Sequence, residues 1–128
     1  YTTFEYIEIP ELKNTSSLSK EQIKDKEAEL ILKYVKNTDK VVLLDERGKN
    51  FTSIEWSKEL EKEIVSGTKS VIFIVGGAYG FSKTIYERAN GKLSLSSMTF
   101  SHQIIRLFFI EQLYRAFTIM KGEPYHHE

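Results

Sequence analysis

The residue types best suited to chemistry are concentrated in the last third of the sequence. A short apolar run, SVIFIV, leads into a glycine-rich turn at 76–80, and a segment of serines and apolar residues follows at 95–100. All three histidines and two arginines come later: His102, Arg106, Arg115, His126 and His127. Histidine titrates near neutral pH and guanidinium binds phosphate in bidentate geometry. This stretch can therefore move protons and hold a phosphate-bearing ligand.

The turn Gly76-Gly77-Ala78-Tyr79-Gly80 lies between an expected strand and an expected helix. Glycine lets the backbone approach a ligand closely and permits positive φ. The turn lacks the Gly-Lys-Ser/Thr sequence of a Walker loop and the G-x-G-x-x-G spacing of a dinucleotide fingerprint. Both of those nucleotide sites are disfavoured, while a ligand-binding turn and a merely tight connection stay open on this motif alone.

The segment Leu95–Phe100 places three hydroxyls, those of Ser96, Ser97 and Thr99, between the apolar side chains of Leu95, Met98 and Phe100. Such a segment can present backbone donors and acceptors to the edge of an adenine and an apolar wall to its face. The alternative is an ordinary approach to a helix, with Thr99 or Ser101 as the N-cap.

A long helix is expected at Ser101–Met120, and its sequence is apolar on more than one side. In a chain of this size, that pattern favours burial of one side against a second copy in a homodimer. His102 and Arg106 are four residues apart and share a face of the helix. Arg106 and Arg115 are suited to phosphate, and the alternative for either is an ion pair with Glu111.

The tail after the helix ends in Glu123-Pro124-Tyr125-His126-His127-Glu128. A folded tail could use Tyr125 as an aromatic platform for a base. The alternative is a loose terminus or the remnant of a tag. Two histidines lack the third ligand that a zinc site requires nearby, so no metal is expected.

The elements that must position these residues alternate between strand and helix. Strands are expected at 3–9, 40–44, 70–75 and 92–94, and helices at 19–37, 52–66, 82–90 and 101–120. The pairs Ser19/Gln22 and Thr52/Glu55 are capping boxes, and Asp45–Gly48 is expected to turn the chain. Alternation of this kind predicts a parallel sheet with helices on its faces and ligands outside the carboxyl ends of the strands. Three loops leave those ends: the one after Leu44, the glycine turn and Leu95–Phe100.

Composition fits one soluble domain spanning residues 1–128. Hydrophobic residues make up 41% and charged residues 28%, and no apolar run is long enough to cross a bilayer. The chain has no cysteine, which excludes a disulfide framework, and a cytoplasmic location is expected. The formal net charge is zero, which argues against non-specific nucleic-acid binding but leaves room for a local RNA-binding patch or one assembled across a dimer.

Taken together, the segments resemble the bacterial ribosomal RNA large subunit methyltransferase H family, of the SPOUT or trefoil-knotted class. Three stretches carry the resemblance: VGGAYG after a strand, LSSMTFSHQIIR, and EQLYRAFTIMKGEPYHHE at the terminus. The segments KVVLLDERGK and IEIP also fit, so the resemblance covers essentially the whole chain. Members of this family begin with a further strand and helix, so we expect an α/β parallel-sheet domain with a C-terminal knot that is incomplete at its N-terminus.

The resemblance implies an S-adenosylmethionine-dependent methyltransferase that acts as a homodimer. Its target would be N3 of a pseudouridine in helix 69 of 23S rRNA, on assembled ribosomes, with no membrane and no metal involved. The cofactor site would comprise Leu44, Gly76, Leu95, Ser96, Ser97, Met98, Thr99 and Phe100. Catalytic roles would fall to Arg106, Tyr125, His126 and His127, and RNA contacts to His102 and Arg115.

Two rival functions follow from the same sequence. One is a non-catalytic RNA-binding ribosome assembly factor with this fold, against which the intact Gly76, Leu95–Phe100 and tail all argue. The other is a nucleotide-binding α/β module, which the missing Walker and dinucleotide spacings disfavour. In the methyltransferase hypothesis, His126 or His127 accepts the proton of N3, and Arg106 stabilises charge on a uracil carbonyl or holds a phosphate.

Overall fold

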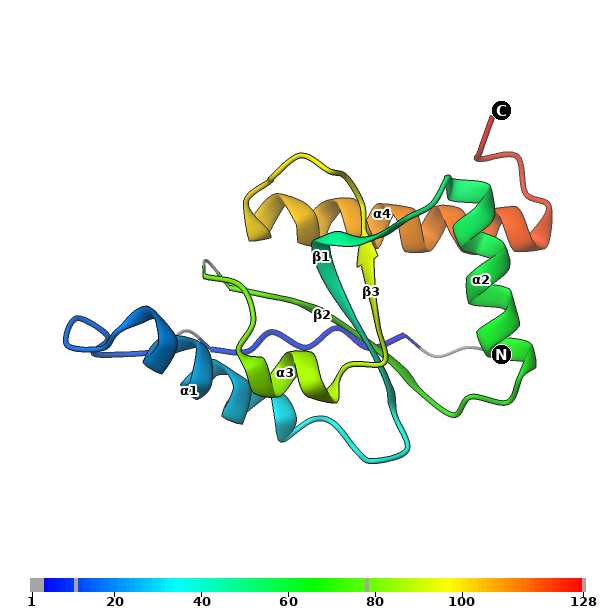
Figure 1. Cartoon of the computed structure of the whole chain (residues 1–128). Helices are drawn as coiled ribbons and strands as arrows, with labels where there is room; N and C mark the ends of the chain where they lie inside the picture. Colours follow the sequence, from blue (N-terminus) through cyan, green and yellow to red (C-terminus); the bar gives the residue numbers. More distant parts are fainter. Residues whose placement is uncertain (1–3, 11, 78, 128) are drawn as a thin grey trace.

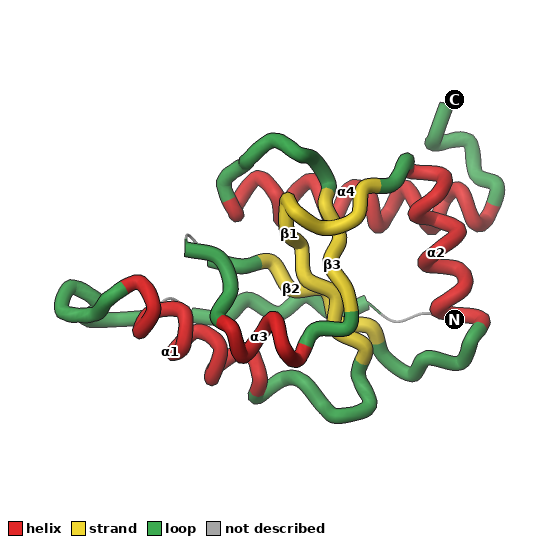
Figure 2. The backbone as a smooth tube through the Cα atoms, viewed as in Figure 1, coloured by secondary structure: helices red, strands yellow, loops and turns green. Residues whose placement is uncertain are grey.

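The computed structural model describes residues 4–10, 12–77 and 79–127 of the chain. In these ranges a three-stranded parallel sheet, in the order β2-β1-β3, lies between two pairs of helices (Figures 1 and 2). The elements follow one another as α1 (Lys20–Leu32), β1 (Lys40–Asn50), α2 (Ser53–Val65), β2 (Val71–Val75), α3 (Lys83–Arg88), β3 (Gly91–Ser94) and α4 (His102–Lys121). The predicted α/β class with a parallel sheet is confirmed.

The two faces of the sheet carry separate cores, because successive residues of a strand point to opposite faces. One face packs against α1 and α3, and its buried residues are Ala28, Val41, Leu43, Ile74, Phe81 and Ile85. The other packs against α2 and α4, and its buried residues are Leu44, Trp56, Leu60, Leu93, Phe109 and Ala116. On this second face the rings of Trp56, Phe73 and Phe109 contact one another edge to face or tilted, which fixes α4 across the sheet.

Local sequence signals place the helix starts. Ser19 and Thr52 form the two predicted capping boxes, and Ser82 and Ser101 cap α3 and α4. Ser101 rather than Thr99 is thus the cap of the last helix. After α2, Gly67 adopts positive φ (82°) and ends the helix as predicted.

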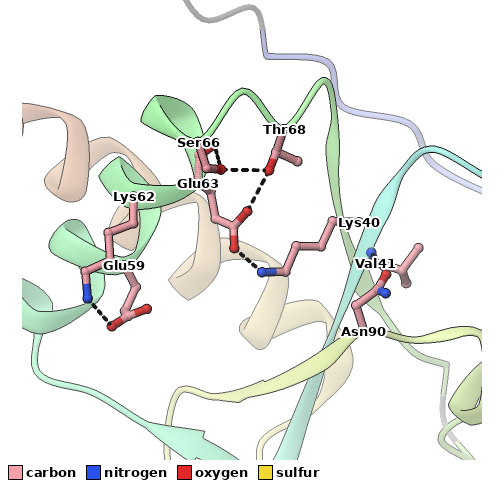
Figure 3. Close-up of polar contacts among 8 residues, drawn as sticks. All are labelled: Lys40, Val41, Glu59, Lys62, Glu63, Ser66, Thr68 and Asn90. Carbon is pink, nitrogen blue, oxygen red and sulfur yellow. Dashed lines mark hydrogen bonds and ion pairs between the residues drawn. The ribbon is translucent and has the colours of Figure 1, made fainter.

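The amino ends of the strands are held by polar contacts that carry no site residue (Figure 3). Lys40 at the start of β1 forms an ion pair with Glu63 of α2, which also accepts a hydrogen bond from Thr68 (3.0 Å). Asn90 donates its N–H to the Val41 carbonyl (2.7 Å) and accepts from the Val41 N–H through Oδ1 (2.8 Å). These bonds place Asn90 beside β1. Helix α3 therefore ends at Arg88, whereas the sequence predicted an end near Asn90.

The prediction of a strand at 3–9 is wrong for the described residues 4–9, which form no ladder; Thr3 lies outside the described ranges. Side chains of this segment are largely exposed, and it contacts α4 through Tyr6 and Glu8 instead. The alternation of apolar and polar residues there is real, but a local pattern does not determine what the segment lies against. Here it lies against Arg106 of α4, and in the described part of the chain the outer edges of β2 and β3 stay unpaired.

Two further boundaries differ from the prediction. Helix α1 ends at Leu32 rather than near Asn37, because Tyr34 and Val35 form the tighter i to i−3 bonds of a last turn. The segment Asp45–Gly48 does not end the strand: β1 continues to Asn50, with a shift of register on β3 between Leu44 and Lys49. We call residues 45–50 the β1 bulge.

No helix in the described ranges combines the length and the apolar character that a membrane crossing requires.

Candidate functional site

The carboxyl ends of the three strands meet at one edge of the sheet. Leu44 is the register partner of both Val75 in β2 and Leu93 in β3. The β1 bulge, the glycine turn and the segment Leu95–Phe100 therefore leave the sheet side by side, which confirms the edge predicted from the alternation of elements. This edge is where open parallel sheets bind ligands. We call it the cofactor edge, because the family resemblance assigns its three loops to the cofactor.

The segment Leu95–Phe100 is held in shape by its own polar groups. Ser94 Oγ donates to the Ser96 carbonyl (2.9 Å), and Ser96 Oγ accepts from the Met98 N–H (3.0 Å). Thr99 Oγ1 donates to Glu46 Oε2 (2.6 Å), which ties the segment to the β1 bulge. The side chain of Met98 is 73% exposed and that of Phe100 is 39% exposed. A fixed backbone with exposed apolar side chains fits the adenine-binding interpretation of this segment.

The β1 bulge lies directly on β3. A Cβ built on Gly48 would be 2.7 Å from the carbonyl carbon of Lys92 and 2.8 Å from the nitrogen of Leu93. Asn50 Nδ2 donates to the Ser94 carbonyl (3.0 Å), at the point where the segment Leu95–Phe100 begins. The bulge therefore braces that segment from the side, a role that reading Asp45–Gly48 as a simple turn had missed.

The glycine turn is contacted by Phe81 of the first core and by Glu27 of α1. A Cβ on Gly76 would lie 3.1 Å from the ring of Phe81, and one on Gly77 would lie 2.6 Å from Oε2 of Glu27. Gly80 adopts positive φ (82°) and donates its N–H to the Gly77 carbonyl (3.1 Å). The positive φ of Gly80 favours glycine at that position, and a side chain at Gly76 or Gly77 would push against Phe81 or Glu27.

Glu27 of α1 is a site residue that the sequence did not reveal. Burial raises the pKa of its carboxyl above the usual value, and the charge of His102 opposes this shift. His102 is the first residue of α4 and is partly buried. Glu27 therefore lies close to the glycine turn and to His102 at the cofactor edge. In the sequence it is 50 residues from Gly77 and 75 residues from His102.

A second polar cluster lies at the far end of α4, where the tail folds back on the helix. Glu111 Oε2 accepts from Arg115 Nη2 (2.7 Å) and from the Tyr125 hydroxyl (2.7 Å). Arg115 Nη1 donates to His126 Nδ1 (3.0 Å), and its guanidinium lies 4.7 Å from the centre of the Tyr125 ring. We call Glu111, Arg115, Tyr125 and His126 the tail cluster. The Glu111 pairing considered for the arginines applies to Arg115, and Glu111 itself was not among the predicted site residues.

These contacts determine the pKa shift of Glu111 and the tautomer of His126. Hydrogen bonds from Arg115 hold the pKa of Glu111 below its usual value, against the effect of burial. Guanidinium can only donate, so Nδ1 of His126 accepts and the neutral ring carries its proton on Nε2. This arrangement makes His126 a hydrogen-bond donor at Nε2 rather than a base there.

The remaining predicted residues lie elsewhere. Arg106 donates to the Tyr6 hydroxyl (3.1 Å) and to Glu8 Oε1 (3.2 Å), and it makes no contact with the tail cluster. His127 is exposed next to the cluster. The structure therefore brings together Arg115, Tyr125 and His126 but not Arg106. Among the described residues, no three His, Cys, Asp or Glu side chains gather into a group able to hold a metal ion.

The two halves of the predicted site are at opposite ends of α4. Figure 1 shows the segment Leu95–Phe100 arching over the start of the helix, while the tail leaves its other end. The helix has 20 residues, which corresponds to a length of about 30 Å. Cofactor-edge residues and the tail cluster of one chain therefore do not share a single cleft.

Comparison with known proteins gives a consistent picture. A family described as "Predicted SPOUT methyltransferase" matches residues 1–126. A protein of Flavobacterium johnsoniae named "Ribosomal RNA large subunit methyltransferase H" is 57% identical over the whole chain, which covers 82% of that protein. Proteins of the same name from Christiangramia forsetii and Parabacteroides distasonis are 58% and 56% identical, over 99% and 100% of the chain and 81% and 82% of their own lengths.

Proposed function

The chain belongs to the SPOUT methyltransferase family, and we propose that it is an S-adenosylmethionine-dependent methyltransferase of ribosomal RNA. One observation carries the proposal: the three loops that leave the carboxyl edge, at Leu44, Gly76 and Leu95, are those that the resemblance assigns to the cofactor. The names of the relatives support ribosomal RNA as the substrate, and a substrate of this kind is consistent with the cytoplasmic location that we propose.

The residues present at this edge fit a methyl donor of this kind. Gly76 and Gly77 are half-buried residues whose backbone a ligand can approach closely, and the segment Leu95–Phe100 combines fixed backbone groups with exposed apolar side chains. Leu44, Gly76 and Leu95–Phe100 would hold the cofactor, which supplies an already activated methyl group when bound. The contribution of the chain is then orientation, exclusion of water and control of the proton on the acceptor atom.

The proposed acceptor is N3 of a pseudouridine in helix 69 of 23S rRNA, on assembled ribosomes. N3 is a weak nucleophile while protonated, and negative charge spreads onto the uracil carbonyls as its proton leaves. In the tail cluster, Tyr125 can stack on the base and Arg115 can stabilise that charge, while His126 positions Arg115 through its hydrogen bond. Exposed His127 is the better placed proton acceptor. We propose RNA contacts for His102 and Arg106 near the other end of α4.

The separation of the two half-sites supports a homodimer. Large apolar side chains of α4 stay exposed along one stripe: Ile104, Leu107, Ile110 and Tyr114. Packing this stripe against a second copy would remove it from water and could bring the tail of one chain to the cofactor edge of its partner. We propose that each active site is composed in this way, within a trefoil-knotted architecture of the SPOUT class.

The function is tested in two steps with the purified chain. First, calorimetric titration of S-adenosylmethionine should show binding to a dimer, checked by light scattering. Second, the chain should transfer a radiolabelled methyl group to 23S rRNA in ribosomes that lack the modification, and mass spectrometry of the labelled fragment should locate it on N3 of a pseudouridine. Cofactor binding without any transfer to ribosomes would favour the rival hypothesis of a non-catalytic assembly factor, and transfer to another atom or base would overturn the proposed target.

A further inference from the structure

Three carboxylates lie near the cofactor edge, and two of them have structural partners. Asp45 accepts from the Tyr86 hydroxyl (2.6 Å) and from the Arg47 N–H (2.9 Å). Glu46 accepts from Thr99 (2.6 Å). The carboxylate of Glu27 has neither a hydrogen bond nor an ion pair with any residue in the described ranges. Of the three, Glu27 is therefore the carboxylate whose oxygens are available to a ligand.

Glu27 is positioned by the packing of α1 along the glycine turn. A Cβ on Gly77 would lie 2.6 Å from its Oε2 and 3.3 Å from its carboxyl carbon, so the carboxylate rests directly on the backbone of the turn. At the start of the same helix, Lys20 lies over the ring of Tyr79, 5.5 Å from its centre. Buried Ala28, next to Glu27, anchors the helix in the first core. Two contacts of α1, Lys20 with Tyr79 and Ala28 with the first core, thus hold the Glu27 carboxylate at the turn.

The surroundings of Glu27 favour a cationic ligand. Burial removes part of the water from the carboxylate, and the charged neighbour that acts on it is His102. A partly desolvated carboxylate gains more than an exposed one from a charge-assisted hydrogen bond. The residues assigned to the cofactor, namely Leu44, Gly76 and Leu95–Phe100, contain no acidic side chain. S-adenosylmethionine carries an α-ammonium group, whose N–H donors need an acceptor that those residues can offer only as backbone carbonyls or hydroxyls.

We propose that the carboxylate of Glu27 binds the α-ammonium group of the methionine part of S-adenosylmethionine. The sulfonium is a poorer match because it has no N–H to donate. The inference rests on the proposed function, since it assumes that the edge holds this cofactor. Glu27 would then be a specificity residue that distinguishes the complete cofactor from fragments that lack the amino group.

The test is calorimetric titration of the wild-type chain, Glu27→Gln and Glu29→Gln with four ligands. S-adenosylmethionine, S-adenosylhomocysteine and decarboxylated S-adenosylmethionine keep the amino group, and methylthioadenosine lacks it. Glu27→Gln should weaken the first three by about tenfold to a hundredfold and leave methylthioadenosine unchanged. Glu29, an exposed residue of the same helix, is the control, and its variant should bind all four ligands like the wild type.

The outcomes separate this inference from the proposed function. Wild-type affinity of Glu27→Gln for S-adenosylmethionine overturns the inference and leaves the function standing. Equal weakening of methylthioadenosine also overturns it, because the variant would then have disturbed the turn itself. Weakening of the two sulfonium ligands, S-adenosylmethionine and decarboxylated S-adenosylmethionine, with S-adenosylhomocysteine unchanged would assign Glu27 to the sulfonium and overturn the ammonium assignment. A folded wild-type chain that binds none of the four overturns the proposed function and the inference with it. Thermal unfolding of each variant, with Glu27→Asp as the charge-conserving comparison, checks the fold.

Discussion

At the scale of single residues, the tail cluster depends on one carboxylate. Glu111 is the common acceptor for Arg115 and Tyr125, and Arg115 in turn contacts His126. Removing the charge of Glu111 should therefore loosen the whole tail without touching either core. The cluster also shows why spacing alone is a weak guide: both Arg106 and Arg115 suit phosphate by type, and only the folded tail distinguishes them.

We expect Glu111→Gln to lower the methylation rate on ribosomes by about tenfold, because Arg115 loses the anionic partner of its ion pair and the hydrogen bond from Tyr125 becomes a neutral one. Hydrogen exchange of residues 122–127 should become faster, while the midpoint of urea unfolding stays nearly unchanged. Glu61→Gln, an exposed change on α2, is the matched control. Unchanged exchange in the tail would show that Glu111 does not hold it.

Acid should act on the same contact. Because the pKa of Glu111 is lowered in the folded chain, its contribution is present above the ordinary pKa of a glutamate and is lost as pH falls through the folded value. Protection of the tail amides, taken relative to the intrinsic exchange rate at each pH, should therefore fall on acidification in the wild type, and in Glu111→Gln it should be low at every pH. A wild-type tail that stays protected in acid would contradict the assignment.

Glu27 should give the opposite pH dependence of stability. Its folded pKa is raised by burial, so the folded chain retains the proton at pH values where the unfolded chain has lost it. The free energy of unfolding of the cofactor-free chain should then fall as pH rises from the ordinary glutamate value through the raised one. Urea unfolding at a series of pH values should show this fall in the wild type and a smaller one in Glu27→Gln. Identical curves would mean that the carboxyl is solvated like an ordinary glutamate.

At the scale of elements, the β1 bulge connects strand pairing to the cofactor edge. Gly48 lies against the backbone of Lys92 and Leu93, so a methyl group there has nowhere to go unless the bulge moves away from β3. Such a shift would also disturb the bonds from Asn50 to Ser94 and from Thr99 to Glu46. Stability and cofactor binding should therefore change together at this position.

We expect Gly48→Ala to lower the free energy of unfolding by about 1–3 kcal/mol and to weaken S-adenosylmethionine binding. Gly91→Ala is the matched control on β3, since a Cβ at Gly91 meets nothing within 4 Å. Its unfolding free energy should stay within about 0.5 kcal/mol of the wild type. Urea unfolding and calorimetry measure both effects. A Gly48→Ala chain as stable as Gly91→Ala would show that the bulge yields easily.

At the scale of the whole molecule, the sequence predicts what depends on neighbours in the chain or on simple periodicity. Capping at Ser19 and Thr52, the apolar strand at Val71–Val75 and the shared carboxyl edge all follow from such signals. The contact between Glu27 and Gly77 does not, because it depends on how α1 packs. The isolated alternation at 4–9 misleads for the same reason: pairing needs a partner strand that a local pattern cannot supply.

The proposed dimer explains why the tail cluster and the cofactor edge lie at opposite ends of α4. Leu107 is 63% exposed in the middle of the apolar stripe, so Leu107→Glu should place a charge in the interface and yield a folded monomer. Light scattering reports the mass, and methylation of ribosomes should be lost. Val65→Glu, at an 80% exposed apolar position on α2, is the control and should stay dimeric. A dimeric Leu107→Glu chain would place the interface elsewhere.

A mixing experiment tests whether each site takes residues from both chains. One variant carries Tyr125→Ala with His126→Ala, and the other carries Gly77→Asp, verified by calorimetry to be folded but unable to bind cofactor. Neither should methylate ribosomes alone. After unfolding and refolding together, half of the dimers are mixed and each has one intact composite site, so activity should return to about a quarter of the wild-type value. If the tail instead served the cofactor edge of its own chain, a mixed dimer would have no intact site and activity would stay absent. The amount of activity recovered therefore decides directly which chain the tail serves.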